Sequence, residues 1–252
     1  MKNKVIAAIA AAGLVMGTFG AQAQNLQNMF NDAKKTLGKV RTGASTGSGT
    51  PSQSEIADGL KQALQVGAQN ATGRLSAVNG FFGNSIIKIL MPPEAKKVET
   101  TLRNVGMGSY VDKAILSMNR AAEDASQKAL PIFVDAIKSI TINDGLSILR
   151  GPNDAATQYL KGRTTSALTT AFRPVIQASL DKVNATAYWK EVFTIYNKLP
   201  TTRTPINPDL AGYVTERALN GVFVNIADEE LKIRQDPAAR VTDLLKKVFG
   251  FK

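Results

Sequence analysis

The sequence contains neither histidine nor cysteine among its 252 residues. Catalytic triads that depend on histidine, cysteine nucleophiles and imidazole proton relays are therefore excluded. Zinc sites with nitrogen and sulfur ligands, and haem or iron–sulfur centres held by these residues, are excluded for the same reason. Carboxylate chemistry, a hydroxyl or lysine nucleophile and a hard metal ion bound by oxygen remain open. No motif calls for these groups, so we expect no cofactor and no metal.

The first 23 residues have the three parts of a secretory signal peptide. A positive region with Lys2 and Lys4 precedes an uncharged, alanine-rich stretch over residues 5–19, and Ala21-Gln22-Ala23 provides a cleavage site. A transmembrane anchor is the alternative, but a spanning helix needs about 20 apolar residues and this stretch is shorter. We therefore expect export, to the periplasm if the host has two membranes and to the medium otherwise.

Basic residues outnumber acidic ones, 31 to 20, so the chain carries a formal net charge of +11. Loss of residues 1–23 would leave 229 residues with a net charge of +9. This balance favours acidic partners, and we expect an anionic lipid or another polyanion of the cell envelope. Nucleic acid fits the charge but not the compartment, and is not expected. No later stretch is long and apolar enough to cross a membrane.

Residues 24–41 predict an amphipathic helix that a linker separates from the rest of the chain. Apolar residues recur every three or four positions, and the polar side carries Lys34, Lys35, Lys39 and Arg41. Residues 42–51 are rich in glycine, serine and threonine, which is typical of a flexible linker. We expect the helix to contact an anionic surface or a protein partner, or to dock on the following domain.

Residues 52–252 predict a single all-α domain, an irregular multi-helix bundle of eight or more helices. The pattern Ser52-x-x-Glu55 is a capping box that opens a helix to about residue 72. Ser109-x-x-Asp112 and Thr141-x-x-Asp144 open two later helices in the same way. Residues 73–91 are the least helical part, with a short extended segment possible near 86–91. Prolines, glycines and capping patterns divide the remainder into expected helices over 93–105, 109–130, 131–140, 142–150, 154–161, 164–181, 185–197, 208–234 and 237–249.

Five segments of this domain resemble one family of exported bacterial proteins. In chain order they are GFFGN at 80–84, SMNRAAE at 117–123, AATQY at 155–159, DLAGYVT at 209–215 and PAARVTDLLKKVFG at 237–250. From about Glu55 to the end, the chain resembles the family called domain of unknown function 4197. The resemblance implies an exported, mainly helical domain with no assigned activity. It therefore implies no catalytic or ligand-binding residue.

A first candidate site lies on the helix expected over 109–130. Arg120 and Glu123 are three residues apart and share a helix face, beside Asn119 and Asp124. Together with Asp135 from the next helix, they could line a polar pocket that binds a ligand. The alternative, which we favour, is an ion-pair network between helices or a solvated face.

A second candidate is the segment from Arg150 to Asp154. Arg150 and Asn153 lie at the start of an expected helix, where free backbone N–H groups favour an anion such as phosphate or carboxylate. No phosphate-binding glycine motif is present, and Asp154 brings a negative charge to the same turn. Ordinary turn chemistry of Gly-Pro-Asn is the alternative.

The acidic run Asp228-Glu229-Glu230 raises the question of catalysis. Consecutive helical residues diverge by about 100°, so these three cannot all face one metal ion. Two facing carboxylates from separate helices would instead suit a carboxylate-dependent hydrolase in a helical cleft. Because the chain contains many carboxylates, two of them can face one another without a catalytic role.

Residues 161–203 combine seven basic residues with five aromatic ones, among them Trp189. Such a surface suits anionic lipid or glycan, because tryptophan and tyrosine are stable where one end is apolar and the other wet. The alternative is that the aromatic residues belong to the core and the lysines face solvent.

Three functions remain open on the sequence alone. The leading one is an exported, non-enzymatic helical domain that binds an amphiphilic ligand, an anionic envelope surface or a protein partner. The second is the carboxylate-dependent hydrolase, and the third is a structural envelope protein.

Cleavage is expected between Ala23 and Gln24, because small residues at 21 and 23 fit signal peptidase. N-terminal sequencing of exported material should begin at Gln24. An intact Met1 on that material would overturn the predicted processing.

Overall fold

The computed structural model describes residues 52–187, 189–190, 194, 205, 209–236, 239–240 and 242–250. The predicted signal peptide, the helix expected over 24–41 and the linker lie outside the described residues. So do most of the helix expected over 185–197 and most of the loop after it.

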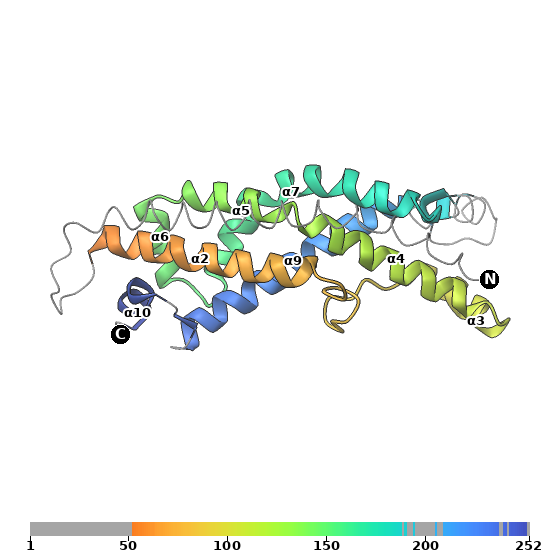
Figure 1. Cartoon of the computed structure of the whole chain (residues 1–252), viewed down its shortest axis with the longest axis horizontal. Coiled ribbons are helices and arrows are strands. Elements are labelled where there is room, and N and C mark those ends of the chain that lie inside the picture. The colour runs from red at the N-terminus through yellow and green to blue at the C-terminus, as the bar shows by residue number, and fades with distance from the viewer. Residues whose placement is uncertain are drawn as a thin grey trace, which may run out of the picture. The chain divides into compact units, whose positions relative to one another are not determined.

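All regular structure in the described part of the chain is helical, which confirms the predicted all-α class (Figure 1). None of these helices is long and apolar enough to span a membrane. The elements are α2 (Gln53–Ser76), the 3-10 helix η1 (Pro93–Ala95), α3 (Lys96–Asn104), α4 (Gly108–Ser126), α5 (Ala129–Lys138), α6 (Ile142–Arg150), α7 (Ala155–Asp181), α9 (Leu210–Gln235) and α10 (Asp243–Gly250).

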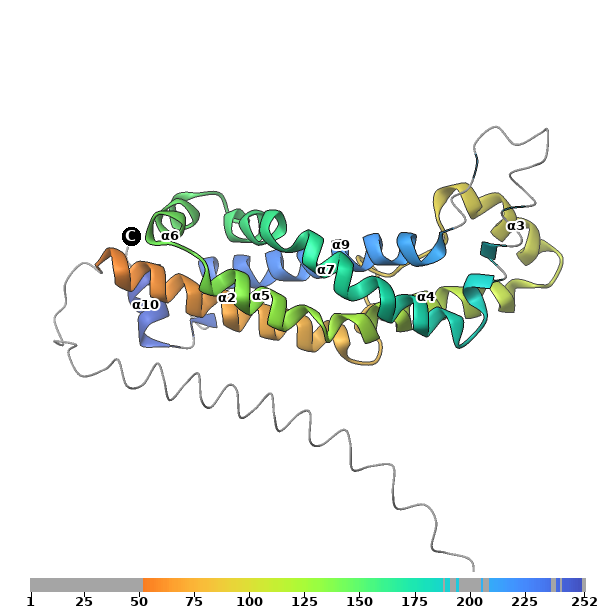
Figure 2. The same ribbon diagram turned by 90° about the horizontal axis from the view of Figure 1, so that it is seen from above.

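Four long helices form the framework. In two perpendicular views α2 and α4 lie along nearly the same line with opposite chain directions, while α7 and α9 run beside them (Figures 1 and 2). Helix α7 packs against both α4 and α9, and α9 also packs against α2. One continuous apolar core lies between them, and it includes an edge-to-face contact of Phe133 with Phe223 at 6.0 Å between ring centroids.

Two of the three expected capping boxes form, whereas Ser109 lies inside α4, whose N-cap Met107 makes no side-chain cap hydrogen bond. The Ser52 hydroxyl accepts from the Glu55 N–H and the Glu55 carboxylate accepts from the Ser52 N–H. Thr141 and Asp144 form the same reciprocal pair at the start of α6. These boxes are local in sequence, which is why a short pattern predicts them correctly.

Helix α7 differs from its prediction, because it is one helix rather than two. No break occurs between residues 161 and 164, and Pro174 lies inside the helix. Gly162 faces solvent, whereas every fourth residue from Leu160 to Ile176 is buried. Continuous burial of this stripe outweighs the helix penalty of one exposed glycine, about 1 kcal/mol.

Other helix boundaries also differ from those expected from the sequence. Helix α4 ends at Ser126 instead of continuing to 130, and α9 is capped by Asp209 instead of Asn207. The last helix begins at Asp243, six residues later than expected, and its Val248 packs on Gly59 of α2. An added Cβ at Gly59 would lie 2.8 Å from Val248, so the glycine allows α10 to approach closely.

No strand forms between α2 and α3. Residues 77–87 make successive turns and residues 88–92 are irregular, although burial alternates along the segment. Ile87, Ile89 and Met91 are buried, while Ile86 and Leu90 are exposed. The predicted extended segment near 86–91 is therefore a stretch of chain without a strand partner. Residues 77–92 are named the α2–α3 loop.

The packing of this loop generates a prediction. Gly221→Ala should destabilise the fold by about 1–3 kcal/mol, because the new Cβ would lie 2.5 Å from Cε1 of the fully buried Phe81. Gly162→Ala is the matched control, since it is also mid-helix but has nothing within 4 Å. It should stabilise by about 0.5–1 kcal/mol. Urea denaturation measures both, and equal effects would contradict the packing of Phe81 against α9.

Candidate functional site

Three glutamates, Glu123, Glu229 and Glu230, are buried in the described part of the chain. Burying a carboxylate without partners is very unfavourable, so such groups mark either a functional site or a structural network. Each of the three is hydrogen-bonded, and no buried side-chain nitrogen or oxygen among the described residues lacks a partner. The partners show which interpretation applies.

Glu123 of α4 holds the first half of the α2–α3 loop. Its Oε1 accepts from the backbone N–H groups of Phe81 and Phe82, both at 3.1 Å, and its Oε2 accepts from Arg120 at 2.5 Å. Arg120 also donates to Oδ1 of Asn79 at 2.9 Å. The predicted Arg120–Glu123 pair is therefore present, and it binds the protein's own backbone.

Asn119, one residue before Arg120, holds the second half of the loop. Its amide is fully buried and pairs with both backbone groups of Ile89, accepting from the N–H at 2.9 Å and donating to the C=O at 2.8 Å. The side chain takes the place of a neighbouring strand for this one residue. Irregular backbone can thereby be buried without unsatisfied polar groups.

Glu230 of α9 caps the start of α7. Its carboxylate accepts from the Ala156 N–H at 3.0 Å and from both the N–H and the hydroxyl of Thr157 at 2.8 Å. These amides belong to the first turn of α7, which has no intrahelical acceptor for them and which favours negative charge. The anion at this helix start is thus a side chain of the protein.

Arg234, one turn after Glu230, completes the same corner. Its guanidinium pairs with Glu230 at 2.8 Å and donates to the carbonyl groups of Ile148 and Leu149 at 2.8 and 3.3 Å. These carbonyls lie in the last turn of α6, where positive charge is favourable. One ion pair on α9 therefore satisfies the end of α6 and the beginning of α7.

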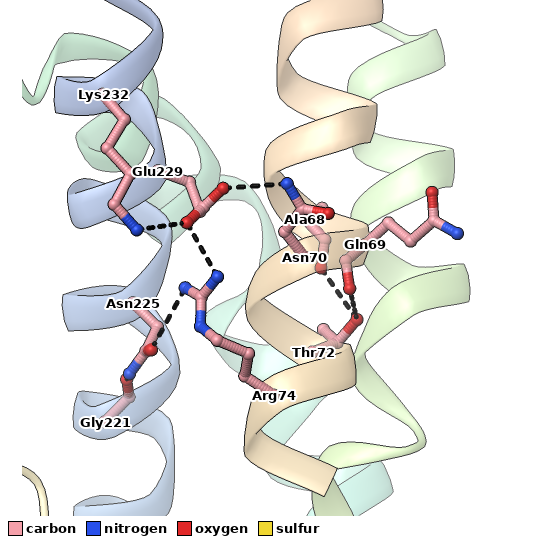
Figure 3. A network of polar contacts seen from close by, with 9 residues as sticks. All are labelled: Ala68, Gln69, Asn70, Thr72, Arg74, Gly221, Asn225, Glu229 and Lys232. Atoms are coloured by element: carbon pink, nitrogen blue, oxygen red, sulfur yellow. Dashed lines mark hydrogen bonds and ion pairs between the residues drawn. The ribbon is translucent and has the colours of Figure 1, made fainter. Parts of the chain in front are cut away.

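Glu229 joins α9 to α2 (Figure 3). It accepts from Arg74 at 2.8 Å, from Asn70 at 3.0 Å and from Lys232 at 2.9 Å. Arg74 extends the network to Asn225 of α9. Burial acts to raise the pKa of Glu229, but the hydrogen bonds from Lys232, Asn70 and Arg74 outweigh it, so that the pKa is lowered.

A small cavity lies between α2, α9 and the start of α7. It has about 20 Å³ of space and is lined mostly by apolar side chains, with Glu230 and Arg234 as its polar members. This volume holds about one water molecule. Among the described residues, no group of three or more acidic side chains could hold a metal ion.

Comparison with known proteins identifies the family. A family model described as a protein of unknown function (DUF4197) matches residues 50–250. The chain belongs to this family. No curated protein and no solved structure matches it.

Within this DUF4197 domain, two of the segments that carry the family resemblance meet in space, and a third binds Glu230. Residues 117–123 supply Asn119, Arg120 and Glu123, whose partners include the backbone of residues 80–84. Residues 155–159 supply the amides that Glu230 binds. The contacts that these segments make are thus between backbone and buried side chains.

The remaining predicted site residues lie apart from these networks. Asp135 is 79% exposed at its side chain and pairs with Lys138 of its own helix. Arg150 and Asn153 are both exposed, near the α7 start whose amides Glu230 occupies. Trp189 is buried as part of the core. The polar pocket proposed for Arg120, Glu123 and Asp135 remains a hypothesis.

Sequence reasoning missed Arg74, Thr157 and Arg234. Their partners lie 155, 73 and 4 residues away in sequence, respectively. Only the last spacing gives a local signal, because Glu230 and Arg234 are one helical turn apart. The other two pairs depend on how α2 and α7 pack on α9.

Removal of Glu230 should be strongly destabilising. Glu230→Ala leaves Arg234 and two helix-start amides buried without their partner, which should cost about 3–5 kcal/mol. Asp228→Ala is the matched control, because Asp228 is an exposed carboxylate two residues earlier on the same helix. It should change the free energy of unfolding by less than about 0.5 kcal/mol. Equal losses in urea denaturation would show that Glu230 has no special role.

The lowered pKa of Glu229 predicts a pH dependence. Because the folded state binds its proton less tightly than the unfolded state, the stabilisation is complete above the ordinary glutamate value of 4.5 and is lost as pH falls through the folded pKa. Glu229→Gln should therefore be less stable than wild type at pH 7, with a difference that shrinks below pH 4.5. Glu216→Gln, an exposed change on α9, should show little difference at either pH, as measured by thermal melts.

Proposed function

We propose that the protein is an exported, non-enzymatic helical domain that binds an anionic surface of the cell envelope. Of the amphiphilic ligand, envelope surface and protein partner considered above, the surface has the most support. The supporting observation is that the domain exposes large apolar side chains in its loops and at a helix start while carrying excess positive charge. Val78, Ile86, Leu90, Val105, Tyr110 and Val183 are each more than half exposed.

The buried carboxylates favour binding over hydrolysis. Glu123, Glu229 and Glu230 accept hydrogen bonds from backbone amides or from cationic and amide side chains. Their carboxylates therefore stabilise the fold. The cavity beside Glu230 holds about one water molecule rather than a substrate. A carboxylate pair that faces a substrate-sized cleft would be the observation that favours an enzyme.

The positive charge of the chain favours an anionic surface. The processed chain would carry a net charge of +9, and residues 24–41 contribute four of its basic residues against the single Asp32. Residues 24–41 lie outside the described structure, so their role in binding is proposed from sequence alone. Each lysine or arginine near an anionic bilayer contributes about 1 kcal/mol before screening by salt.

The processed protein should co-sediment with vesicles of phosphatidylglycerol and phosphatidylcholine at low salt, and less at high salt. It should not co-sediment with pure phosphatidylcholine vesicles. Replacing Lys34, Lys35, Lys39 and Arg41 together by glutamine should weaken binding if residues 24–41 take part. Protein that stays in the supernatant with anionic vesicles at low salt would refute the surface-binding function and favour a protein partner or a structural role.

A further inference from the structure

The α2–α3 loop exposes apolar side chains to an unusual degree. Ile86 is 79% exposed and Val78 is 77% exposed, the highest values among the large apolar residues described. In the view of Figure 1 the loop, drawn in gold after α2, projects from the helices. Exposed apolar side chains that share one projecting segment are typical of an interaction site.

The same loop is held rigidly at its base. Phe81 is fully buried against Gly221, and the backbone is bonded to Glu123 and Asn119 of α4. Gly80 has no room for a side chain, because an added Cβ would lie 2.4 Å from the carbonyl oxygen of Arg74. The exposure of Val78 and Ile86 is therefore built into the loop, which lacks the freedom to fold them back into the core.

Two cations lie over one aromatic ring on this loop. The Lys88 Nζ is 3.9 Å from the ring centroid of Phe82, and the Arg120 Cζ is 5.9 Å from it. Lys88 makes no ion pair with a described residue, whereas Arg120 is paired with Glu123, whose other carboxylate oxygen accepts from the loop backbone. Arg120 also donates to Asn79, which is next to Val78, and Lys88 lies two residues after Ile86. Each of the two most exposed apolar side chains therefore has a cation near it.

We propose that the α2–α3 loop inserts into the interface of an anionic phospholipid membrane, with Val78 and Ile86 entering the apolar boundary and Lys88 and Arg120 contacting lipid phosphate. This inference rests on the proposed surface-binding function and assigns it to one site. An anionic bilayer has a layer of negative head groups above an apolar interior. Exposed apolar side chains flanked by cations match both layers.

The other exposed apolar turn does not share this pattern. Val105 and Met107 are exposed between α3 and α4 and Tyr110 is exposed in the first turn of α4, but Arg103 beside them is paired with both Glu99 and Asp112. Lys113 also lies near that turn, with its Nζ 5.9 Å from the ring centroid of Tyr110, so Arg103 and Lys113 are matched there by Glu99 and Asp112. At the α2–α3 loop, Lys88 and Arg120 are accompanied, among the described residues, by Glu123 alone, which leaves one positive charge in excess. Charge complementarity favours the α2–α3 loop as the site that faces anionic lipid.

A fluorescent reporter can test insertion residue by residue, because the chain has no native cysteine. The processed full-length protein would carry Ile86→Cys or, as a matched control, Val183→Cys, each labelled with an environment-sensitive dye. Val183 is also exposed, at 56%, but lies in the turn after α7. With phosphatidylglycerol-containing vesicles the dye at residue 86 should shift to shorter wavelength and be quenched by brominated lipid. The dye at residue 183 should do neither.

Substitutions test the two components of the loop. Lys88→Gln should weaken binding to anionic vesicles about fivefold, as expected for one cation at an anionic surface. Ile86→Asp should weaken it about tenfold or more, because an isoleucine that enters the apolar boundary is replaced by a charge. Lys161→Gln on α7 is the control for loss of one exposed cation and should change affinity little. Far-ultraviolet circular dichroism and emission of the single tryptophan, Trp189, verify that each variant is folded.

The outcomes separate the loop assignment from the wider function. If the protein co-sediments with anionic vesicles but the dye at residue 86 remains in water, the loop assignment is overturned and binding occurs elsewhere on the chain. If the protein does not co-sediment, both proposals fail and a protein partner becomes the occupant to seek. An equal response with pure phosphatidylcholine vesicles would overturn the role of Lys88 and Arg120.

Discussion

The ion pair between Glu230 and Arg234 determines how the helices at one corner of the domain can pack. A helix ends with carbonyl groups and begins with N–H groups that have no intrahelical partner. Helices α6 and α7 meet through a short connection, and both of these ends face α9. Arg234 satisfies the carbonyls and Glu230 the amides, with charges that match the two helix dipoles. The corner can therefore be buried without leaving polar backbone groups unpaired.

The same requirement explains the polar residues around the α2–α3 loop. Phe81 anchors the loop in the core, which brings its backbone N–H group into a region without water. Glu123 and Asn119 supply the partners that regular secondary structure would supply elsewhere. Residues that could have formed a ligand pocket thus bind the protein's own main chain, and the loop keeps a defined shape while its outer side chains face solvent.

Sequence analysis predicted the features that depend on short spacings. The all-α class, the capping boxes at Ser52 and Thr141, and the pairing of Arg120 with Glu123 all involve residues three or four positions apart. It failed where tertiary packing outweighs local preference, as in α7, whose buried stripe continues past Gly162. The contacts of Glu229 with Arg74 and of Glu230 with Thr157 join helices that are distant in sequence. No local pattern encodes them, so the structural roles of these acids could not be predicted.

The close approach of α10 to α2 at Gly59 has a consequence for the order of folding. The first helix of the described domain packs against α4, α5 and α6 and also against the last two helices, α9 and α10, so part of its apolar face is covered by residues more than 130 positions later in the chain. Contacts of such long sequence separation form late, because the chain must first close a large loop. During synthesis α2 therefore leaves the ribosome well before α9 and α10 exist. The core is therefore complete only when both ends of the domain are present, although α4, α5 and α6 can cover part of α2 before that.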